Sequence, residues 1–441
     1  MTGQLGTPSV KCHLSTTPMG FESLFAVIAF VLILSRTATE LFLSRLNQSH
    51  VRAHANEPPP EFRGIIDEAT HRRSADYTLA KGRLGNIVTM FDAAVLIGVL
   101  FSGLLPRTFE RVSAGFGTSV WAMAGFILAV GVALSILELP FGWYAQFKLE
   151  ERFGFNTITM KTWVLDRVKG LLLAFLLGYP LLLLVLKLIE WTGPHWWLWA
   201  TVVVIGFQLL LLLIAPSLIM PLFNKFTPLP QGMLRNRLHA LAQRADFPTR
   251  NIEVMDGSKR SRHSNAFFTG FGRLRKIVLF DTLVAQLTEP ELEAVLAHEI
   301  GHYKKRHVFK LLAAFVAGVF VAFALIAWLA SQAWFYRAFG FEHHAGFAAA
   351  NVAPAMLLFG MLAETLTFWL SPVTHFWSRR FEYEADTFAR TIMGETQSLI
   401  QALRKLSEKN LSNLTPHPLY SGFYYSHPTL IERERALTSE S

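Results

Sequence analysis

The segment that decides the fold runs from Thr288 to His302 and reads TEPELEAVLAHEIGH. Its start is typical of a helix, because Thr288 can cap it and Glu291 can reach back to complete a capping box. Leu292 and Leu296 then repeat at helical spacing and give the helix a buried side. The segment therefore predicts an amphipathic helix that ends in the motif H-E-x-x-H.

Two histidines four positions apart point to the same side of a helix. His298 and His302 can therefore bind one zinc ion together, with Glu299 beside that ion as a base. The bare pattern also turns up by chance in chains of this length, so the interpretation depends on a further ligand elsewhere in the sequence.

A second helical run, RRFEYEADTFA from Arg379 to Ala389, supplies that ligand. A catalytic zinc takes three protein ligands and keeps one position for water, and two histidines with one glutamate form a known set. We assign Glu382 as the third ligand. Asp386, one turn later on the same face, is expected to accept the other ring proton of His298. Such an acidic pair alone would indicate a solvated face, but the neighbouring zinc motif favours ligands.

The composition indicates an integral membrane protein. Charged residues make up 17% of the chain and hydrophobic residues 52%. The apolar residues gather in runs of the about 20 residues that a membrane helix needs. The first run has no small-residue cleavage site, so we expect a span and not a signal peptide. Seven runs are predicted to cross the bilayer, near residues 21–43, 84–105, 119–141, 170–190, 197–220, 308–334 and 347–371.

The distribution of Lys and Arg predicts the topology, because short basic connections stay in the cytoplasm. The 44–83 connection carries seven such residues and the 142–169 connection five, whereas the 106–118 connection carries two. With seven spans, the amino end lies outside and the carboxyl end is cytoplasmic. Segments 221–307 and 372–441, which carry the zinc residues, then lie together on the cytoplasmic side.

The formal net charge of +9 follows from this topology and favours membrane lipid with anionic head groups as a partner, with no reason to expect nucleic acid. The single cysteine, Cys12, excludes an internal disulfide and a thiolate zinc site. Ionisable residues within the spans should face inward or, near span ends, reach the interface. They are Arg36, Glu40, Asp92, Glu138, Lys187, Lys310 and Glu364. A water-containing cavity would account for Asp92 and Glu364.

Between the fifth span and the zinc helix the sequence becomes polar and predicts a small sheet. The expected elements are a helix over 228–244, strands over 251–255, 265–269 and 276–280, and a turn at Gly270-Phe271-Gly272. An extended substrate could add to this sheet as a strand, with Asn265 and Ala266 at the edge. The alternative is an ordinary hairpin with a turn-forming asparagine.

Near the carboxyl end, Ser426-His427-Pro428 precedes a terminal helix that is predicted to start at Pro428. A hydrolytic zinc site needs a donor for the oxyanion that forms during hydrolysis. His427 is a candidate for that donor, although a lone histidine before a helix is more often a cap or a surface residue.

These motifs, taken as a set, carry a family likeness. They include ERFGFN at 151–156, PLFNKFTPL at 221–229, HSNA at 263–266, VLFDTL at 278–283, the zinc helix, the run around Glu382 and SHP at 426–428. The chain resembles the type I CAAX prenyl proteases, which are multi-pass zinc metalloproteases, and more distantly the HtpX-like membrane proteases. That family removes the last three residues of a substrate, which follow a prenylated cysteine at its carboxyl terminus.

The resemblance implies seven helices around a large intramembrane chamber, with zinc at its cytoplasmic rim. It also implies zinc binding by His298, His302 and Glu382, activation of water by Glu299, and assistance to substrate or oxyanion binding by three further residues. These are Asn265, His427 and Arg433.

The expected fold is mainly α: a polytopic membrane protein with seven transmembrane helices around a chamber, plus a cytoplasmic α+β zinc metalloprotease domain with a small β-sheet. The expected parts are a tail (1–20), spans one to five (21–220), a catalytic segment with the H-E-x-x-H helix (221–307), spans six and seven (308–371) and a carboxyl-terminal catalytic segment (372–441). The carboxyl end shows no retrieval signal for the endoplasmic reticulum. We therefore expect a bacterial inner membrane, or the endoplasmic reticulum membrane in a eukaryotic host.

The expected function is that of an integral-membrane zinc metalloendopeptidase acting on a peptide or protein, prenylated at a carboxyl-terminal cysteine. The alternative within the same class is an HtpX-like quality-control protease. The alternatives of another class are a cation transporter, suggested by the charges within the spans, and a non-catalytic scaffold that binds zinc.

Overall fold

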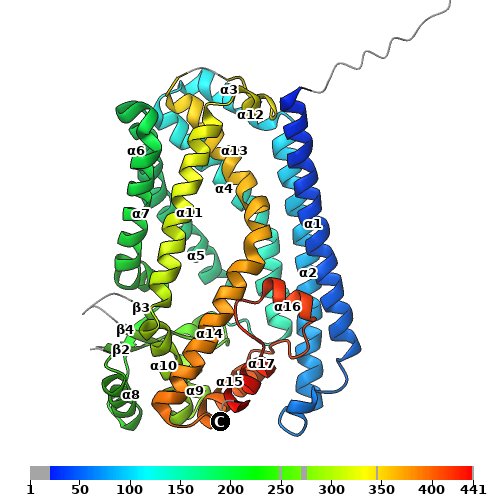
Figure 1. The fold of residues 1–441 in the computed structure, drawn as a ribbon, viewed down its shortest axis with the longest axis vertical. Helices are drawn as coiled ribbons and strands as arrows, with labels where there is room; N and C mark the ends of the chain where they lie inside the picture. Colours follow the sequence, from blue (N-terminus) through cyan, green and yellow to red (C-terminus); the bar gives the residue numbers. More distant parts are fainter. Residues whose placement is uncertain (1–19, 248–250, 270–275, 344–345, 440–441) are drawn as a thin grey trace, which may run out of the picture.

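The computed structural model describes residues 20–247, 251–269, 276–343 and 346–439. Long helices stand side by side in a bundle, and a smaller part that mixes helices and strands lies at one end of it (Figure 1). The first helix begins at the opposite end, whereas the carboxyl-terminal helix lies at the same end as the small sheet. The turn predicted at residues 270–272 lies outside the described residues.

The membrane-crossing helices differ from the prediction in one place. In the described part, six helical stretches are long and apolar enough to cross a membrane, where seven were predicted. They are Phe21–Ala53 (α1), Glu68–Phe101 (α2), Val120–Glu150 (α4, Val120–Tyr144, with a π-helical turn), Met160–Leu222 (α5 to α7), His307–Ala330 (α11) and Ala349–Met393 (α13 and α14).

The two predicted runs at 170–190 and 197–220 both fall within Met160–Leu222, so the count of seven separate runs is not confirmed. This stretch folds back on itself: α6 (Tyr179–Thr192) and α7 (Trp196–Ile214) pack against each other (Figure 1). Gly193, with φ +54°, begins the one-turn 3₁₀ connection between them. The reversal is therefore itself helical, and no loop separates the two runs.

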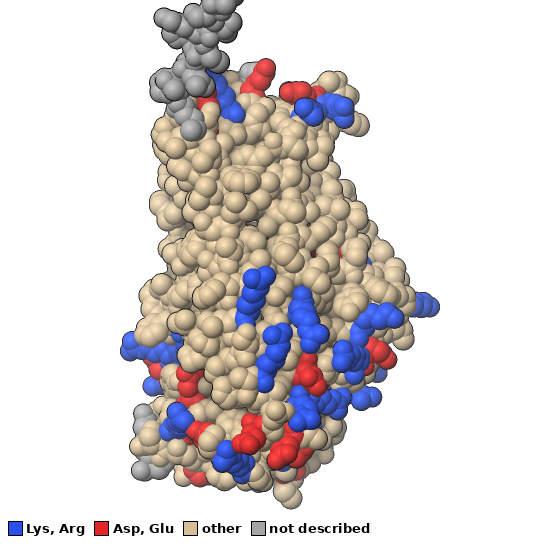
Figure 2. All heavy atoms as spheres, turned by 90° about the vertical axis from the view of Figure 1, so that its right-hand side faces the viewer, with Lys and Arg blue, Asp and Glu red and all other residues tan. Residues whose placement is uncertain are grey.

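The first two helices extend beyond the apolar runs that predicted them. α1 continues to Ala53, and α2 begins at Glu68, where the Asp67 side chain caps it by accepting a hydrogen bond from the Thr70 amide. On the face that these helices form, Figure 2 shows a broad uncharged band, with Lys and Arg gathered below it. The remaining short helices of the bundle are α3 (Leu104–Phe116), α5 (Met160–Leu173) and α12 (Ala333–Arg337).

The sheet has four strands in the order β1-β2-β4-β3. They are β1 (Phe226–Pro228), β2 (Asn251–Met255), β3 (Ala266–Thr269) and β4 (Lys276–Phe280). β2 and β4 are parallel, and the outer pairs are antiparallel. The helix predicted over 228–244 was wrong at its start. α8 runs from Met233 to Arg244, because Pro228 ends an edge strand, where its missing amide hydrogen costs no ladder bond.

The zinc-motif helix, α10 (Glu289–Lys304), lies at the centre of the soluble part. The predicted capping box is present between Thr288 and Glu291. The other helices of this part are α9 (Asp281–Gln286), α15 (Gln397–Lys409), α16 (Pro418–Tyr424) and α17 (Leu430–Ser439). α17 thus begins at Leu430, whereas the sequence predicted its start two residues earlier, at Pro428. The buried Leu292, Leu296 and Ile300 of α10 join one apolar core with β2, β4 and α15.

Two membrane helices lead directly into this soluble part. Two residues separate α10 from α11, and the second of them, Arg306, takes the left-handed conformation, with φ +56°. α13 (Ala349–Thr367) continues through a 3₁₀ turn into α14 (Ser371–Met393), which carries Glu382 and Asp386. The predicted amphipathic run around Glu382 is therefore a continuation of the last membrane helix.

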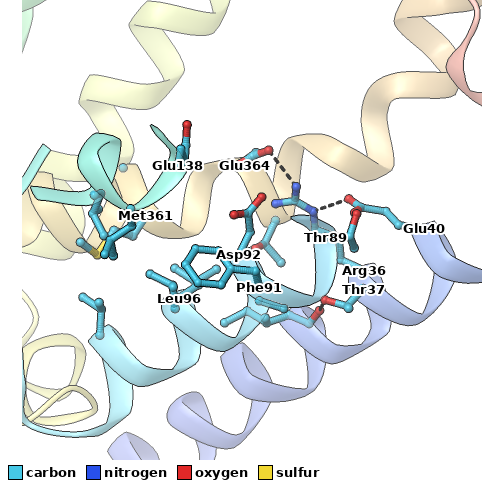
Figure 3. A pocket seen from close by; sticks show the side chains of 18 residues that line it. Arg36, Thr37, Glu40, Thr89, Phe91, Asp92, Leu96, Glu138, Met361 and Glu364 are labelled. Atoms are coloured by element: carbon cyan, nitrogen blue, oxygen red, sulfur yellow. Dashed lines mark hydrogen bonds and ion pairs between the residues drawn. The ribbon is translucent and has the colours of Figure 1, made fainter. Parts of the chain in front are cut away.

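Charged residues of the spans face a common pocket of about 310 Å³, as predicted for Arg36, Glu40, Asp92, Glu138 and Glu364 (Figure 3). Arg36 of α1 donates hydrogen bonds of 2.7 Å to Glu40 and to Glu364 of α13. A second pocket of about 640 Å³ shares Glu40 with the first and extends to His263. Together the two pockets extend from Arg36 among the membrane helices to His263, three residues before β3. Lys187, near the end of α6, instead pairs with Glu190.

Candidate metal centre

Three side chains from two helices converge on one point. The Nε2 atoms of His298 and His302 lie 3.2 Å apart. The carboxylate of Glu382 approaches His302 Nε2 at 3.3 Å and His298 Nε2 at 3.4 Å. A tetrahedral zinc site with bonds of about 2.0–2.1 Å separates its ligand atoms by about 3.3 Å. The three distances therefore fit three corners of such a site.

The hydrogen bonding of these atoms also fits a cation. Glu382 Oε2 is buried and makes no hydrogen bond in the described part of the chain, although His298 Nε2 lies 3.4 Å and Arg433 Nη1 3.7 Å away. A buried carboxylate oxygen without a hydrogen bond is costly in an apolar setting. Two imidazole nitrogens and a carboxylate oxygen are ligand types that zinc prefers, and a divalent ion would satisfy all three at once. The residues present thus fit a metal ion.

Close packing of α10 on α14 brings these ligands together. Gly301 lies at the contact, where a Cβ atom would stand 3.0 Å from both the Cα and the carbonyl oxygen of Ala385. Because glycine lacks that atom, the two backbones can approach closely. The glycine within the motif HEIGH therefore lets Glu382, three residues before Ala385, reach the two histidines.

A buried ion pair orients His298. Its Nδ1 lies 2.8 Å from Asp386 Oδ1. Arg433 of α17 donates to both Asp386 oxygens, at 2.8 and 2.5 Å. Burial and the charge of Arg433 lower the pKa of His298, but the hydrogen bonds with Asp386 and Glu382 have the larger combined effect. The net result raises this pKa to about 9. The structure thus places Asp386 against His298, where the sequence expected it.

The Glu299 carboxylate stands beside the ligands without binding them. In the described residues it makes no hydrogen bond or ion pair with another side chain. Burial raises its pKa, while the neighbouring His298 and His302 act in the opposite direction. A carboxylate in this position is free to bind a water molecule.

The other predicted residues surround the site at different distances. His427 Nε2 lies 3.4 Å from Glu382 Oε1, and the His427 side chain is 65% exposed. Ala266 begins β3, an outer strand of the sheet, and Asn265 Oδ1 accepts a hydrogen bond from the Ala266 amide. Arg433 is buried, and its guanidinium turns to Asp386. This geometry favours support of Asp386 over direct contact of Arg433 with a substrate.

Sequence reasoning missed two residues near the second histidine. His302 Nδ1 lies 3.0 Å from His307 Nδ1. His307 Nε2 in turn lies 3.0 Å from Glu384 Oε2. Both residues lie close in sequence to predicted ligands, since Glu384 follows Glu382 by two positions and His307 follows His302 by five. Helical periodicity could not connect His307 with His302, however, because α10 ends between the two histidines.

Comparison with known proteins gives one consistent result. Residues 47–225 match the family model for the CAAX prenyl protease amino-terminal region with five membrane helices, and residues 228–441 match peptidase family M48. The chain is 37% identical to CAAX prenyl protease 1 of Saccharomyces cerevisiae, over 86% of this chain and 88% of that protein. It is 39% identical to the CAAX prenyl protease 1 homolog of Dictyostelium discoideum, over 92% of this chain and 95% of that protein.

The same likeness holds in three dimensions. The crystal structure of S. mikatae Ste24p superposes with a TM-score of 0.84 at 33% sequence identity, covering 94% of this chain and 98% of that chain. The mainly helical fold with a small sheet, predicted from the sequence, is therefore confirmed.

A bundle of membrane-crossing helices that ends in a buried His-His-Glu site defines the class of integral-membrane metalloproteases. Sequence and structure agree on the group within that class. The chain belongs to peptidase family M48, together with the CAAX prenyl proteases. It is a multi-pass membrane protease that acts on a peptide or protein, and neither the cation transporter nor the non-catalytic scaffold agrees with this membership.

Proposed function

We propose that the protein is a zinc endopeptidase that cuts its substrates close to a prenylated carboxyl-terminal cysteine. The observation that carries the proposal is the tetrahedral spacing of His298, His302 and Glu382 beside the unpaired carboxylate of Glu299. The relatives named CAAX prenyl protease 1 support the choice of substrate. The HtpX-like alternative differs only in substrate, and the experiment below separates the two.

Zinc bound by His298, His302 and Glu382 would supply a Lewis acid and make a water molecule acidic at neutral pH. Glu299 accepts the proton of the attacking water and passes it to the leaving amine. Asp386 holds the proton on Nδ1 of His298, so that Nε2 is free to bind the metal, and Arg433 holds Asp386 in turn. His427, at the exposed side of Glu382, donates a hydrogen bond to the oxyanion.

The substrate backbone lies along β3. This strand pairs only with β4 among the described strands, so its other edge has free backbone groups. Strand addition there would use main-chain hydrogen bonds for affinity. Asn265, just before the strand, contacts the substrate if its Oδ1 gives up the Ala266 amide.

The catalytic side faces the cytoplasm in this proposal. The excess of Lys and Arg in the 44–83 and 142–169 connections supports that orientation. The carboxyl-terminal helix and the sheet lie at the same end of the bundle, opposite the start of α1, which agrees with both catalytic segments on one side of the membrane (Figure 1). The expected location stays the bacterial inner membrane, or the endoplasmic reticulum membrane in a eukaryotic host.

The test is cleavage of a farnesylated reporter peptide by the detergent-solubilised full chain. We expect cleavage that 1,10-phenanthroline abolishes and added zinc restores. The unprenylated peptide of the same sequence is the control, and we expect it to be cut at least about tenfold more slowly, because burial of an apolar chain contributes to binding. Equal cleavage of both peptides would favour the quality-control alternative, and no cleavage of either would overturn the proposal.

A further inference from the structure

A second hydrogen-bonded pathway leads away from the metal centre on the side opposite Asp386. We propose that His307 is a positioning residue, which links His302 to Glu384 and fixes the ring nitrogen that His302 presents to the metal. The inference rests on the proposed function, since it concerns how His302 binds the ion. It assigns a role to two residues that carry none in the mechanism above.

The side chains of His302, His307 and Glu384 contact one another in that order, starting from the metal centre. His302 Nε2 faces Glu382 and His298, at 3.3 and 3.2 Å. Its other nitrogen, Nδ1, lies 3.0 Å from His307 Nδ1. His307 Nε2 lies 3.0 Å from Glu384 Oε2. The pathway therefore runs from the metal centre through two rings to a carboxylate.

Only one arrangement of protons satisfies every contact when a metal is bound at Nε2 of His302. That nitrogen must then be free of a proton, so the proton of the neutral ring is on Nδ1 and is donated to His307. His307 accepts it at Nδ1, so its own proton is on Nε2 and is donated to Glu384. The reverse tautomer of His307 would bring two N–H groups face to face. The Glu384 carboxylate, which only accepts, thus selects the tautomer of both rings.

The surroundings hold His307 in this position. The residue is 2% exposed, and its ring stacks on Phe381 with centroids 4.3 Å apart and an interplanar angle of 14°. Glu384 is anchored as well, because Lys310 and Arg380 lie 3.5 and 3.4 Å from its oxygens. His307 is the first residue of α11, and Phe381 and Glu384 lie on α14. The pathway therefore ties the membrane helix after the motif to the helix of the third ligand.

The two metal-binding histidines are supported in different ways. His298 contacts its carboxylate directly, and that carboxylate is buried with Arg433. His302 reaches its carboxylate through a second ring, and the Glu384 side chain is 30% exposed. A longer pathway that ends near solvent should contribute less to metal affinity, and loss of an outer partner of a ligating histidine typically costs about 10–100-fold in metal affinity.

The experiment compares two replacements of His307 in the full chain, loaded with zinc in detergent. His307→Phe keeps a flat ring on Phe381 but removes both nitrogens. His307→Gln offers an amide oxygen as acceptor and an amide nitrogen as donor. His71→Phe is the matched control, because His71 is equally buried, at 2% exposed, and lies in α2 with a hydrogen bond to the His54 carbonyl. Zinc content is measured by elemental analysis after dialysis against graded chelator.

We expect His307→Phe to lose zinc at about tenfold or more lower chelator concentration than the unchanged chain. His307→Gln should stay within about threefold, and His71→Phe should match the unchanged chain. With cobalt in place of zinc, the visible absorption bands should shift in His307→Phe alone, because they report the geometry of the ligands. These two readouts do not depend on turnover.

Full zinc retention and an unshifted cobalt spectrum in His307→Phe would overturn the inference and leave the proposed function intact. If the unchanged chain itself bound no zinc, the proposed function would fail instead. Should His307→Phe not fold, Glu384→Ala and Glu384→Gln provide the same comparison at a partly exposed position. Glu384→Ala is expected to lose zinc more readily than Glu384→Gln, whose oxygen still accepts from His307, and equal retention would again overturn the inference.

Discussion

At the scale of single residues, two glutamates beside the candidate metal centre have different roles. Glu382 lies between two imidazoles and has a buried oxygen that makes no hydrogen bond in the described residues, so it is suited to bind a cation. Glu299 lies on the same helix as both histidines but contacts neither through a hydrogen bond in the described residues. The environment, and not the residue type, thus separates the ligand from the base.

This separation predicts different consequences for the two carboxylates. Glu299→Gln should retain zinc but lower kcat by about 10²–10⁴-fold, because only the proton transfer is lost. Elemental analysis and the farnesylated-peptide assay on the same sample measure both quantities. Glu57→Gln, at a side chain that is 76% exposed, is the control and should behave like the unchanged chain. Turnover of Glu299→Gln at the normal rate would contradict the mechanism.

The pKa of His298 gives a second prediction at this scale. In the metal-free protein that pKa is raised to about 9, so at pH 7 the ring carries a proton that a metal must displace. Zinc binding at pH 7 should therefore release about one proton from this residue, and affinity should rise about tenfold per pH unit up to pH 9. Calorimetry in two buffers that differ in ionisation enthalpy measures this, and equal heats in both would refute it.

The sequence placed these residues well because local spacing relates them. His298 and His302 share one helical face, and Glu382 and Asp386 share another. His307 was missed for a physical reason: α10 ends at Lys304, and the left-handed residue Arg306 redirects the chain before His307. Contacts across such a corner depend on backbone geometry that no periodicity reports.

At the scale of elements, the contact of α10 with α14 decides whether the ligands meet. Gly301→Ala should force the helices apart, because the new methyl would stand 3.0 Å from backbone atoms of Ala385. Overpacking of this kind typically costs about 1–3 kcal/mol. We expect a lower Tm and weaker zinc binding, measured by thermal unfolding and chelator competition.

The control for this variant is Gly318→Ala in α11, where an added Cβ meets nothing within 4 Å. Alanine is the better helix former, so this change should leave the Tm equal or slightly higher. A Gly301→Ala protein with normal zinc affinity would show that the close approach of the helices is not needed.

Errors in the predicted elements came from places where tertiary contacts override local pattern. Residues 228–232 were assigned to a helix, but Phe226–Pro228 pairs with β2 and delays α8 to Met233. Similarly, α17 begins at Leu430 and not at Pro428. In both cases a proline was taken as the start of a helix, whereas its neighbours are held by other contacts.

At the scale of the whole molecule, the orientation across the membrane is open to a direct test. Phe116 is 80% exposed and ends α3, and Met233 is 69% exposed and begins α8. These two helices lie at opposite ends of the structure (Figure 1). Phe116→Cys and Met233→Cys are each made in a Cys12→Ser background, which removes the single natural thiol.

An impermeant maleimide applied to intact spheroplasts should label Phe116→Cys and leave Met233→Cys unlabelled until the membrane is opened. The Cys12→Ser parent should stay unlabelled throughout. The reverse pattern would place the catalytic end outside and contradict the topology.

Composition predicted the membrane class reliably, because hydropathy over a window of about 20 residues sums many small contributions. The predicted runs at 170–190 and 197–220 lie on either side of the reversal at Gly193, where a helical turn joins them within one long apolar stretch. Composition does not show, however, which ionisable residues of the spans lie close together. Arg36 and Glu40 lie one turn apart on α1, whereas Glu364 comes from α13, far away in the chain, and only packing brings the three into one pocket (Figure 3).

The direct passage of α11 and α13 into the ligand-bearing helices has one more consequence. The segments that hold His302 and Glu382 are connected by two bilayer crossings, and their relative height is set where those crossings are anchored. We therefore expect a fragment made without the lipid-embedded portion to lose that alignment and, with it, the hydrolytic activity.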